Sequence, residues 1–401
     1  MDETRQQIRR MASAAGKRST KKKTQDYYDF SLLAVIIVLT GFGLIMLYST
    51  TAYSAQSIYG SDMYYFSRQA QISAGCIIMA LMISRFDYHI LTRFTTILYA
   101  AAIVLMALVR TPLGLESHGA KRWIGLGPLS FQPSEIAKIA VIVCLSYSIV
   151  RMGKQIATGR GFMVLLLMGG AQAAGAMFLT DNLSTAIIIF SITVGLIFIA
   201  HPRTVPFLLV FLGIAVLVIV FVTFLSRSLS SSSDFRLMRI LVWLHPEDYA
   251  SSDGYQTLQA LYAIGSGGFF GRGLGNSIQK ISSIPEAQND MIFSIICEEL
   301  GVFGAVLVLG LFGYLLYRLF FIAQNAPDLF GSLLVSGIFI HIALQVILNI
   351  SVVLNLMPNT GVTLPFISYG GTASLFIMAE MGLALSVSRS IRFQNVADPL
   401  F

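Results

Sequence analysis

Two apolar runs meet within residues 161–200, which read GFMVLLLMGGAQAAGAMFLTDNLSTAIIIFSITVGLIFIA. Only the polar pair Asp181 and Asn182 separates the run 161–180 from the run 183–200. Each run has close to the ~20 residues that an α-helix needs to cross ~30 Å of hydrocarbon. Because two residues leave no room for a longer path, the stretch predicts a tight hairpin of two membrane-spanning helices.

Eight further apolar runs of similar length lie on both sides of this hairpin. Hydrophobic residues make up 55% of the 401 residues and charged residues 12%, about half the ~25% typical of soluble domains. This composition excludes a soluble enzyme and a disordered chain, and it predicts an all-α polytopic membrane protein with about ten transmembrane helices. The other predicted spans are 29–50, 69–85, 92–110, 133–151, 205–225, 291–322, 329–355 and 368–388.

The distribution of basic residues predicts the orientation of the chain. The segment 1–28 is a basic tail, and by the positive-inside rule it is cytoplasmic. Ten spans over 29–388 return the second tail, 389–401, to the same side. The net charge of +7 is therefore a topology signal and a membrane-surface anchor, and it does not indicate nucleic-acid binding. The basic residues of the first tail are Arg5, Arg9, Arg10, Lys17, Arg18, Lys21, Lys22 and Lys23.

Three loops fall on the outer side in this topology. The loop 226–290, between the seventh and eighth helices, is long enough to be functional or to contain structure of its own. The others are 111–132 and 356–367. The last contains Pro358 and Pro365 but no charge, which is typical of a rigid segment and compatible with a re-entrant path.

No standard soluble-enzyme site is indicated by the glycine-rich stretch, the histidines or the cysteines. The glycine-rich stretch 265–275 lacks the ending of a P-loop and the spacing of a dinucleotide site. Two interpretations remain equally supported: a flexible or tightly turned loop, and a backbone that comes close to a phosphate-bearing substrate. The five histidines show no metal-ligand spacing, and we expect no metal site. The three cysteines all lie within apolar runs, where they are best interpreted as small core residues. They are Cys76, Cys144 and Cys297.

Charged residues within or beside apolar runs are the strongest functional candidates, because a charge in hydrocarbon is costly. Glu135 and Lys138 share a helix face, as a stabilising pair or as substrate ligands. Asp290 stands just before the eighth run and fits a general base beside an anion-binding cluster. The remaining candidates are Glu286, Glu298, Glu299, Lys280, Arg272, Arg236 and Arg239. A transporter and a membrane transferase acting on a lipid-linked anion both fit these residues.

Three separated motifs resemble the signatures of the SEDS family, whose members act in bacterial shape, elongation, division and sporulation. The first is Gly119–Ile124, which contains Lys121 and Arg122, followed by Gln132–Lys138. The second combines Gly254–Gln256, the glycine-rich stretch and Pro285–Asp290. The third is Leu364–Gly371, which contains Ser368 and Tyr369. The stretch Gly273–Lys280, before the Pro-Glu-Ala motif, and the long basic N-terminal tail resemble division-type and sporulation-type members more than elongation-type members.

The chain departs from the family pattern at two places. Gln288, Asn289 and Asp290 stand where the family usually has His-Thr-Asp, so the acid is kept and its neighbours are not. Asn182 stands at a position that is usually acidic, and we therefore assign no catalytic role to Asn182 or Asp181.

The resemblance implies a peptidoglycan glycosyltransferase that polymerises lipid II at the outer membrane face during cell division, at the septum, or during sporulation. Asp290 would be the base of an inverting displacement, and the other charged candidates, with Ser368 and Tyr369, would bind substrate. A class B penicillin-binding protein would be the partner, among other divisome membrane proteins and membrane lipids. No cofactor is evident, although Mg²⁺ or Mn²⁺ on the pyrophosphate is compatible with the chemistry. A lipid II flippase and a non-catalytic divisome scaffold are the alternatives, and we find no internal repeat of the kind typical of transporters.

Overall fold

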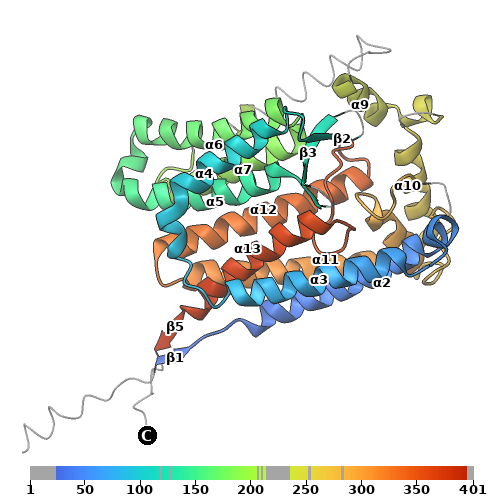
Figure 1. Cartoon of the computed structure of the whole chain (residues 1–401), viewed down its shortest axis with the longest axis horizontal. Helices are drawn as coiled ribbons and strands as arrows, with labels where there is room; N and C mark the ends of the chain where they lie inside the picture. The colour runs from blue at the N-terminus through green and yellow to red at the C-terminus, as the bar shows by residue number, and fades with distance from the viewer. Residues whose placement is uncertain are drawn as a thin grey trace, which may run out of the picture.

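The computed structural model describes residues 24–117, 120–126, 129–205, 207–208, 211–213, 235–251, 254–280 and 284–394. Within these residues nine helices are long and apolar enough to cross a membrane, and Figure 1 shows them running side by side along one direction. The long helices are α2 (Phe30–Tyr59), α3 (Tyr64–Ile83), α4 (Ile90–Leu108), α5 (Pro133–Met152), α6 (Gly159–Leu179), α7 (Leu183–Ala200), α11 (Ile292–Asn325), α12 (Leu329–Val353) and α13 (Gly371–Arg389).

The prediction of an all-α polytopic membrane protein is confirmed, and each of these nine helices corresponds to a predicted run. The seventh predicted run, 205–225, lies for the most part outside the described residues. The predicted hairpin is present, because α6 ends at Leu179 and α7 begins at Leu183. Asn182 begins α7 by accepting a hydrogen bond from the Thr185 backbone N–H at 3.0 Å, which satisfies one of the free donors of a helix N-terminus.

The first helix is longer than the predicted run 29–50, since α2 extends to Tyr59. Its last turns are rich in Ser, Thr and Tyr, so the apolar run ends before the helix does. Gly60 then ends the helix in a left-handed conformation, with φ of 70°. At the other end, Asp29 caps the helix by accepting from the Leu32 N–H at 2.8 Å and forms a buried ion pair with Arg318 of α11 at 2.7 Å.

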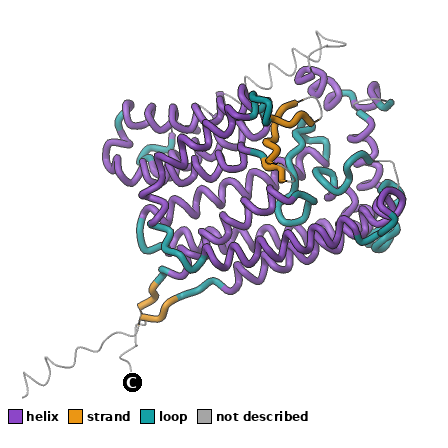
Figure 2. Tube along the Cα trace, in the orientation of Figure 1, coloured by secondary structure: helices purple, strands orange, loops and turns teal. Residues whose placement is uncertain are grey.

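The two tails meet at one end of the bundle. Strand β1 (Thr24–Asp26) pairs antiparallel with β5 (Arg392–Gln394), and Figure 2 shows both strands beyond the helix ends. The described parts of the two tails therefore lie at the same end of the bundle, as the ten predicted crossings require.

The opposite end carries most of the remaining elements. A small antiparallel sheet joins α4 to α5 and contains β2 (Gly114–Ser117), β3 (Ala120–Leu126) and β4 (Leu129–Phe131). Helices α9 (Phe235–Leu244) and α10 (Tyr255–Gly267) lie at the same end (Figure 1). The 3₁₀ turn η2 (Pro246–Tyr249) lies between them in the chain, whereas the turn η1 (Gly153–Ala157), which follows α5, lies at the end that carries β1 and β5. The end with α9 and α10 gathers the three motifs that the sequence singled out.

Candidate functional site

The segment 284–290, which carries Asp290 and which we call the base loop, joins the glycine-rich stretch to α11. Hydrogen bonds from three different segments hold its backbone carbonyls, so its path is fixed from α10, from α12 and from the turn that precedes α13. These bonds are Gln256 Nε2 to Pro285 O at 3.2 Å, Asn349 Nδ2 to Asp290 O at 2.7 Å and Tyr369 N to Gln288 O at 2.9 Å.

Glu286 and Asn289 form a tight turn inside the base loop. Glu286 has a φ of 50°, a left-handed conformation that is uncommon for a residue with a side chain. Its carbonyl accepts from the Asn289 N–H at 2.9 Å, and its carboxylate accepts from Asn289 Nδ2 at 2.8 Å. Asn289, one of the departures from the family pattern, therefore supports the turn that leads directly to Asp290.

Ser368 and Tyr369 belong to a compact turn that precedes α13. The Ser368 hydroxyl is buried and accepts from the Leu364 N–H at 2.8 Å. The ring of Tyr369 meets that of Tyr65 edge to face at 5.5 Å. Thus Ser368 shapes the turn, while the backbone of Tyr369 reaches the base loop.

The glycine-rich stretch packs against an interruption in α11. Gly301 lies inside α11 with a φ of 65° and a ψ of −160°, so the helix is broken there. The N–H groups of Arg272 and Gly273 donate to the carbonyls of Glu298 and Glu299, each at 2.9 Å. A Cβ added at Gly271 would lie 2.2 Å from the Glu299 carbonyl oxygen. Glycine is therefore needed for backbone to meet backbone, which favours the tight-turn interpretation at Gly271.

The two buried glutamates of α11 have separate sets of partners. Glu298 accepts from the Ile278 N–H at 3.0 Å and from the Ser277 hydroxyl at 2.5 Å, and Arg272 Nε lies 3.9 Å away. These contacts attach the end of the glycine-rich stretch to α11.

Glu299 forms a buried ion pair with Lys280. The Nζ to Oε1 distance is 2.8 Å, and the side chains are 7% and 0% exposed, with Lys280 given first. Ser49 of α2 joins the pair, because its hydroxyl donates to Glu299 at 2.6 Å and accepts from Lys280 Nζ at 3.2 Å. Lys280 therefore connects α2 and α11, and the structure does not bring it out to solvent.

Glu135 and Lys138 are also paired inside the bundle, at 2.9 Å near the start of α5. Arg122 of β3 donates to the carbonyl of Asp181 at 3.2 Å, and its burial lowers the pKa of its guanidinium while Asp181 opposes that change. Asp181 also pairs with Arg110 at 3.0 Å. The first motif is thus linked to the α6–α7 hairpin through Arg122 and Asp181.

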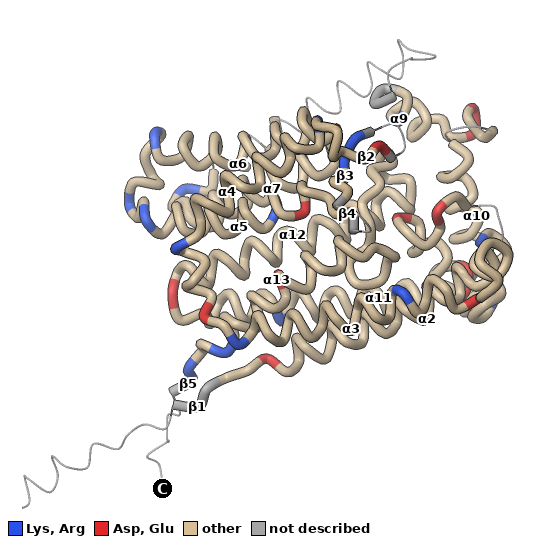
Figure 3. Tube along the Cα trace, in the orientation of Figure 1, with Lys and Arg blue, Asp and Glu red and all other residues tan. Residues whose placement is uncertain are grey.

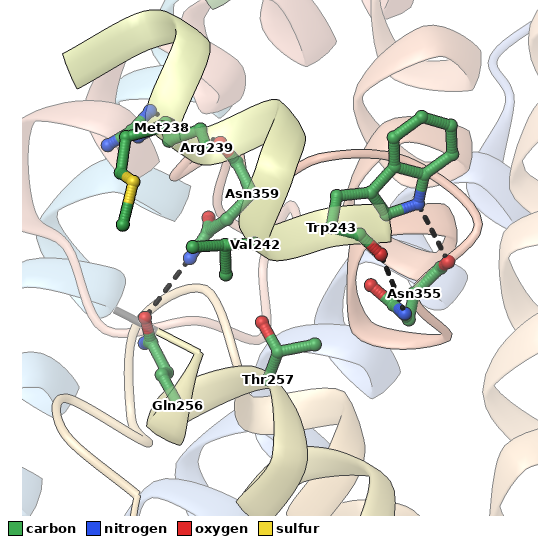
Figure 4. Close-up of a pocket in the computed structure, with 8 residues that line it drawn as sticks. All are labelled: Met238, Arg239, Val242, Trp243, Gln256, Thr257, Asn355 and Asn359. Carbon is green, nitrogen blue, oxygen red and sulfur yellow. Dashed lines mark hydrogen bonds between the residues drawn. The ribbon is translucent and has the colours of Figure 1, made fainter. Parts of the chain in front are cut away.

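A small pocket of about 130 Å³ lies between α9, α10 and the loop after α12. Figure 4 shows two pairs of hydrogen-bonded residues that hold its walls together. Trp243 Nε1 donates to the Asn355 carbonyl at 2.9 Å, and Asn359 Nδ2 donates to Gln256 Oε1 at 3.1 Å. Arg239 lines the pocket and donates to the Asn359 carbonyl at 3.2 Å. Arg236 lies in the first turn of the same helix.

Sequence reasoning missed Ser49 and Asn349, although each holds a charged or loop residue of this region. It included Gln256 only as part of the second motif and gave it no role of its own. Uncharged side chains in apolar helices give little signal by themselves. On α12, however, Gln345 and Asn349 are four residues apart and share one face, and this spacing is a signal that could have identified them.

Metal-binding residues do not come together in the part of the chain that the structure describes. No group of three or more His, Cys, Asp or Glu side chains there could hold a metal ion. The buried carboxylates are already engaged, Glu298 by Ser277 and Glu299 by Lys280. The described residues therefore do not fit a protein-built divalent cation site.

Comparison with known proteins agrees with the three motifs. A family model for the FtsW, RodA and SpoVE proteins, described as cell cycle proteins, matches residues 30–392. The stage V sporulation protein E of Bacillus subtilis is 38% identical, over 93% of this chain and 100% of its own length. A probable peptidoglycan glycosyltransferase FtsW of Trichlorobacter lovleyi is 35% identical, over 91% of this chain and 94% of its own.

Solved structures of similar proteins have the same fold. A chain from a study of polymerization and crosslinking by a peptidoglycan synthase complex matches with a TM-score of 0.74 and 28% identity, covering 90% of this chain and 98% of that one. The rod shape determining protein RodA of Thermus thermophilus matches with a TM-score of 0.64 and 28% identity, over 90% and 97% of the two chains. The chain therefore belongs to the FtsW, RodA and SpoVE family of cell cycle proteins, the SEDS family that its motifs predicted.

Proposed function

We propose that this protein is a peptidoglycan glycosyltransferase that polymerises lipid II at the outer face of the bacterial membrane. The observation that carries the proposal is the base loop, which places an acidic residue at the start of α11 and is held by three separate segments. Relatives that align over more than 90% of this chain are named as probable peptidoglycan glycosyltransferases, and they support the assignment.

In this reaction the acceptor hydroxyl attacks the anomeric carbon of the growing chain. Asp290 takes the proton of that hydroxyl as the new C–O bond forms, and the lipid pyrophosphate leaves with the electron pair of the broken bond. One base and one direct displacement invert the α-linked donor to a β-linkage. Cationic side chains of the outer loops, other than the buried Lys280, stabilise the charge on the departing diphosphate. The described residues offer no cage for a divalent cation, and we assign no step to one.

A class B penicillin-binding protein is the proposed partner, and other divisome membrane proteins would assemble around the pair at the septum. The match to a chain from a peptidoglycan synthase complex supports a partner. The outer halves of α11 and α12 are the proposed contact surface, because large apolar side chains are exposed there. Examples are Phe303 at 62%, Val306 at 61% and Ile347 at 59%.

The direct test is to purify the protein with its penicillin-binding partner, add lipid II and separate the products on a gel. Glycan polymer is the expected result. A flippase would transport lipid II between leaflets without making polymer, and a scaffold would do neither. Absence of polymer from a folded, assembled complex would therefore contradict the proposal.

We also propose that both tails are cytoplasmic. Figure 3 shows Lys and Arg gathered at the end of the bundle that carries β1 and β5, as the positive-inside rule predicts for the cytoplasmic side. Cysteines introduced at Glu247 and Lys154, exposed residues at opposite ends of the bundle, test this orientation. In intact cells a membrane-impermeant maleimide should label Glu247→Cys and leave Lys154→Cys unlabelled.

The background in this labelling experiment should be low, because the native cysteines Cys76, Cys144 and Cys297 are buried. Labelling of both variants in permeabilised cells is the control for reactivity. The reverse pattern in intact cells would place the base loop in the cytoplasm and contradict the proposed site.

A further inference from the structure

Asn349 of α12 is a buried side chain that connects two loops of the proposed site. Its side-chain amide nitrogen donates to the backbone carbonyl of Asp290 at 2.7 Å and to that of Val362 at 2.8 Å. The residue is 1% exposed. The bonds therefore form away from bulk water, where a donor without its acceptor is costly.

The geometry of a primary amide makes this contact rigid. The NH₂ group has two hydrogens in one plane, and each is directed to one of the two carbonyls. Asp290 lies before Met291, the residue that caps the N-terminus of α11, so its carbonyl precedes the hydrogen-bond ladder of that helix. Asn349 thus supplies a donor to the backbone of Asp290 itself.

Gln345 provides an internal comparison one turn earlier on the same helix. It is 3% exposed, and its Nε2 donates to the Thr363 carbonyl at 3.2 Å. Gln345 and Asn349 therefore both hold the loop that follows α12, through the adjacent residues Thr363 and Val362. Only Asn349 also bonds to Asp290.

We propose that Asn349 is a positioning residue for the glycosyl transfer, which it affects through Asp290. By holding the Asp290 backbone to the loop at Val362, it fixes the place from which the carboxylate meets the acceptor hydroxyl. A displacement of about 1 Å at a reacting group can cost on the order of 10²-fold in rate. This role rests on the proposed function, since it requires Asp290 to act as the base.

The test compares Asn349→Ala with Gln345→Ala in the complex with the penicillin-binding partner, using lipid II as substrate. Each change removes one buried amide from the same face of α12 and one hydrogen bond to the loop that contains Val362 and Thr363. Asn349→Ala also removes the hydrogen bond to Asp290, which is the difference that the comparison tests. We expect Asn349→Ala to lower kcat by about 10- to 100-fold with KM within about threefold. We expect Gln345→Ala to stay within about threefold of the wild-type kcat.

Thermal melting of both variants in detergent separates a folding defect from a positioning defect. If Asn349→Ala does not fold, Asn349→Ser is the second variant, because it is smaller, remains polar and can donate one hydrogen bond. Its kcat should also fall while KM is kept. Equal losses of kcat in the Asn349 and Gln345 variants, or a wild-type kcat in a folded Asn349 variant, would overturn the proposal. A wild-type complex that makes no polymer would instead overturn the proposed function.

Discussion

Asp290→Asn should abolish detectable polymerisation of lipid II while the protein still folds and binds its partner. Asparagine keeps the size of the side chain and part of its hydrogen bonding, but it cannot accept the proton of the attacking hydroxyl. Loss of a general base typically costs ~10²–10⁴ in rate. The backbone bonds to Tyr369 and Asn349 use main-chain carbonyls of the base loop, so the substitution leaves them available. Polymer on a gel and co-purification of the partner are the two measurements.

Glu286→Gln is the matched control, because it makes the same carboxylate-to-amide change within the base loop. Glu286 accepts from Asn289 within its own turn, and we assign it to substrate positioning. Its loss should therefore be smaller than that of Asp290→Asn. If Asp290→Asn polymerised lipid II at a near wild-type rate, the base would have to be sought elsewhere, first at Glu298 and Glu299.

The membrane helices could be predicted because hydropathy is a local property of the chain. A run of about 20 apolar residues has the length and composition of a membrane-spanning helix. Nine such runs are helices in the described part of the chain. The end of α2 was misplaced because its last turns, near Tyr59, are polar yet still helical. Hydropathy marks the part of a helix that lies in the hydrocarbon. A helix that continues beyond the hydrocarbon ends where a residue such as Gly60 breaks the helix.

The position of Asp290 could also be inferred from sequence, since an acid directly before an apolar run stands at a helix mouth. Its supports could not. Tyr369 and Asn349 reach the base loop from 81 and 59 residues away in the chain, through contacts with Gln288 and Asp290. Such pairings depend on how α12 and α13 pack, and periodicity within one helix contains no information about them.

The glycine-rich stretch illustrates a second limit. Its composition allowed a tight turn or a phosphate site equally, because both need backbone without side chains. The structure adds the interruption at Gly301, whose added Cβ would lie 2.4 Å from the Gly271 nitrogen. Two glycines far apart in sequence are thus explained by one close approach.

For Lys280, the sequence correctly indicated a residue that pairs with an anion, but it did not indicate which anion. As a cation ten residues before Asp290, it was predicted to bind the substrate's anion, whereas the structure places it 2.8 Å from Glu299 with 7% of its side chain exposed. If its role is this pair, Lys280→Met should strongly lower the stability of the protein. Removing one partner of a buried ion pair typically costs about 3–5 kcal/mol, because the other charge stays buried without compensation.

The double variant Lys280→Met/Glu299→Gln distinguishes a structural pair from a substrate ligand. It removes both charges and keeps the side-chain lengths, and Ser49 can still donate to the new amide oxygen. Its thermal unfolding in detergent should therefore lie closer to wild type than that of Lys280→Met, which is the coupling expected of two groups in contact. A lysine that instead binds the diphosphate would leave the melting temperature of Lys280→Met unchanged and raise KM for lipid II. In that case removing Glu299 as well would restore nothing, and the substrate role predicted from the sequence would stand.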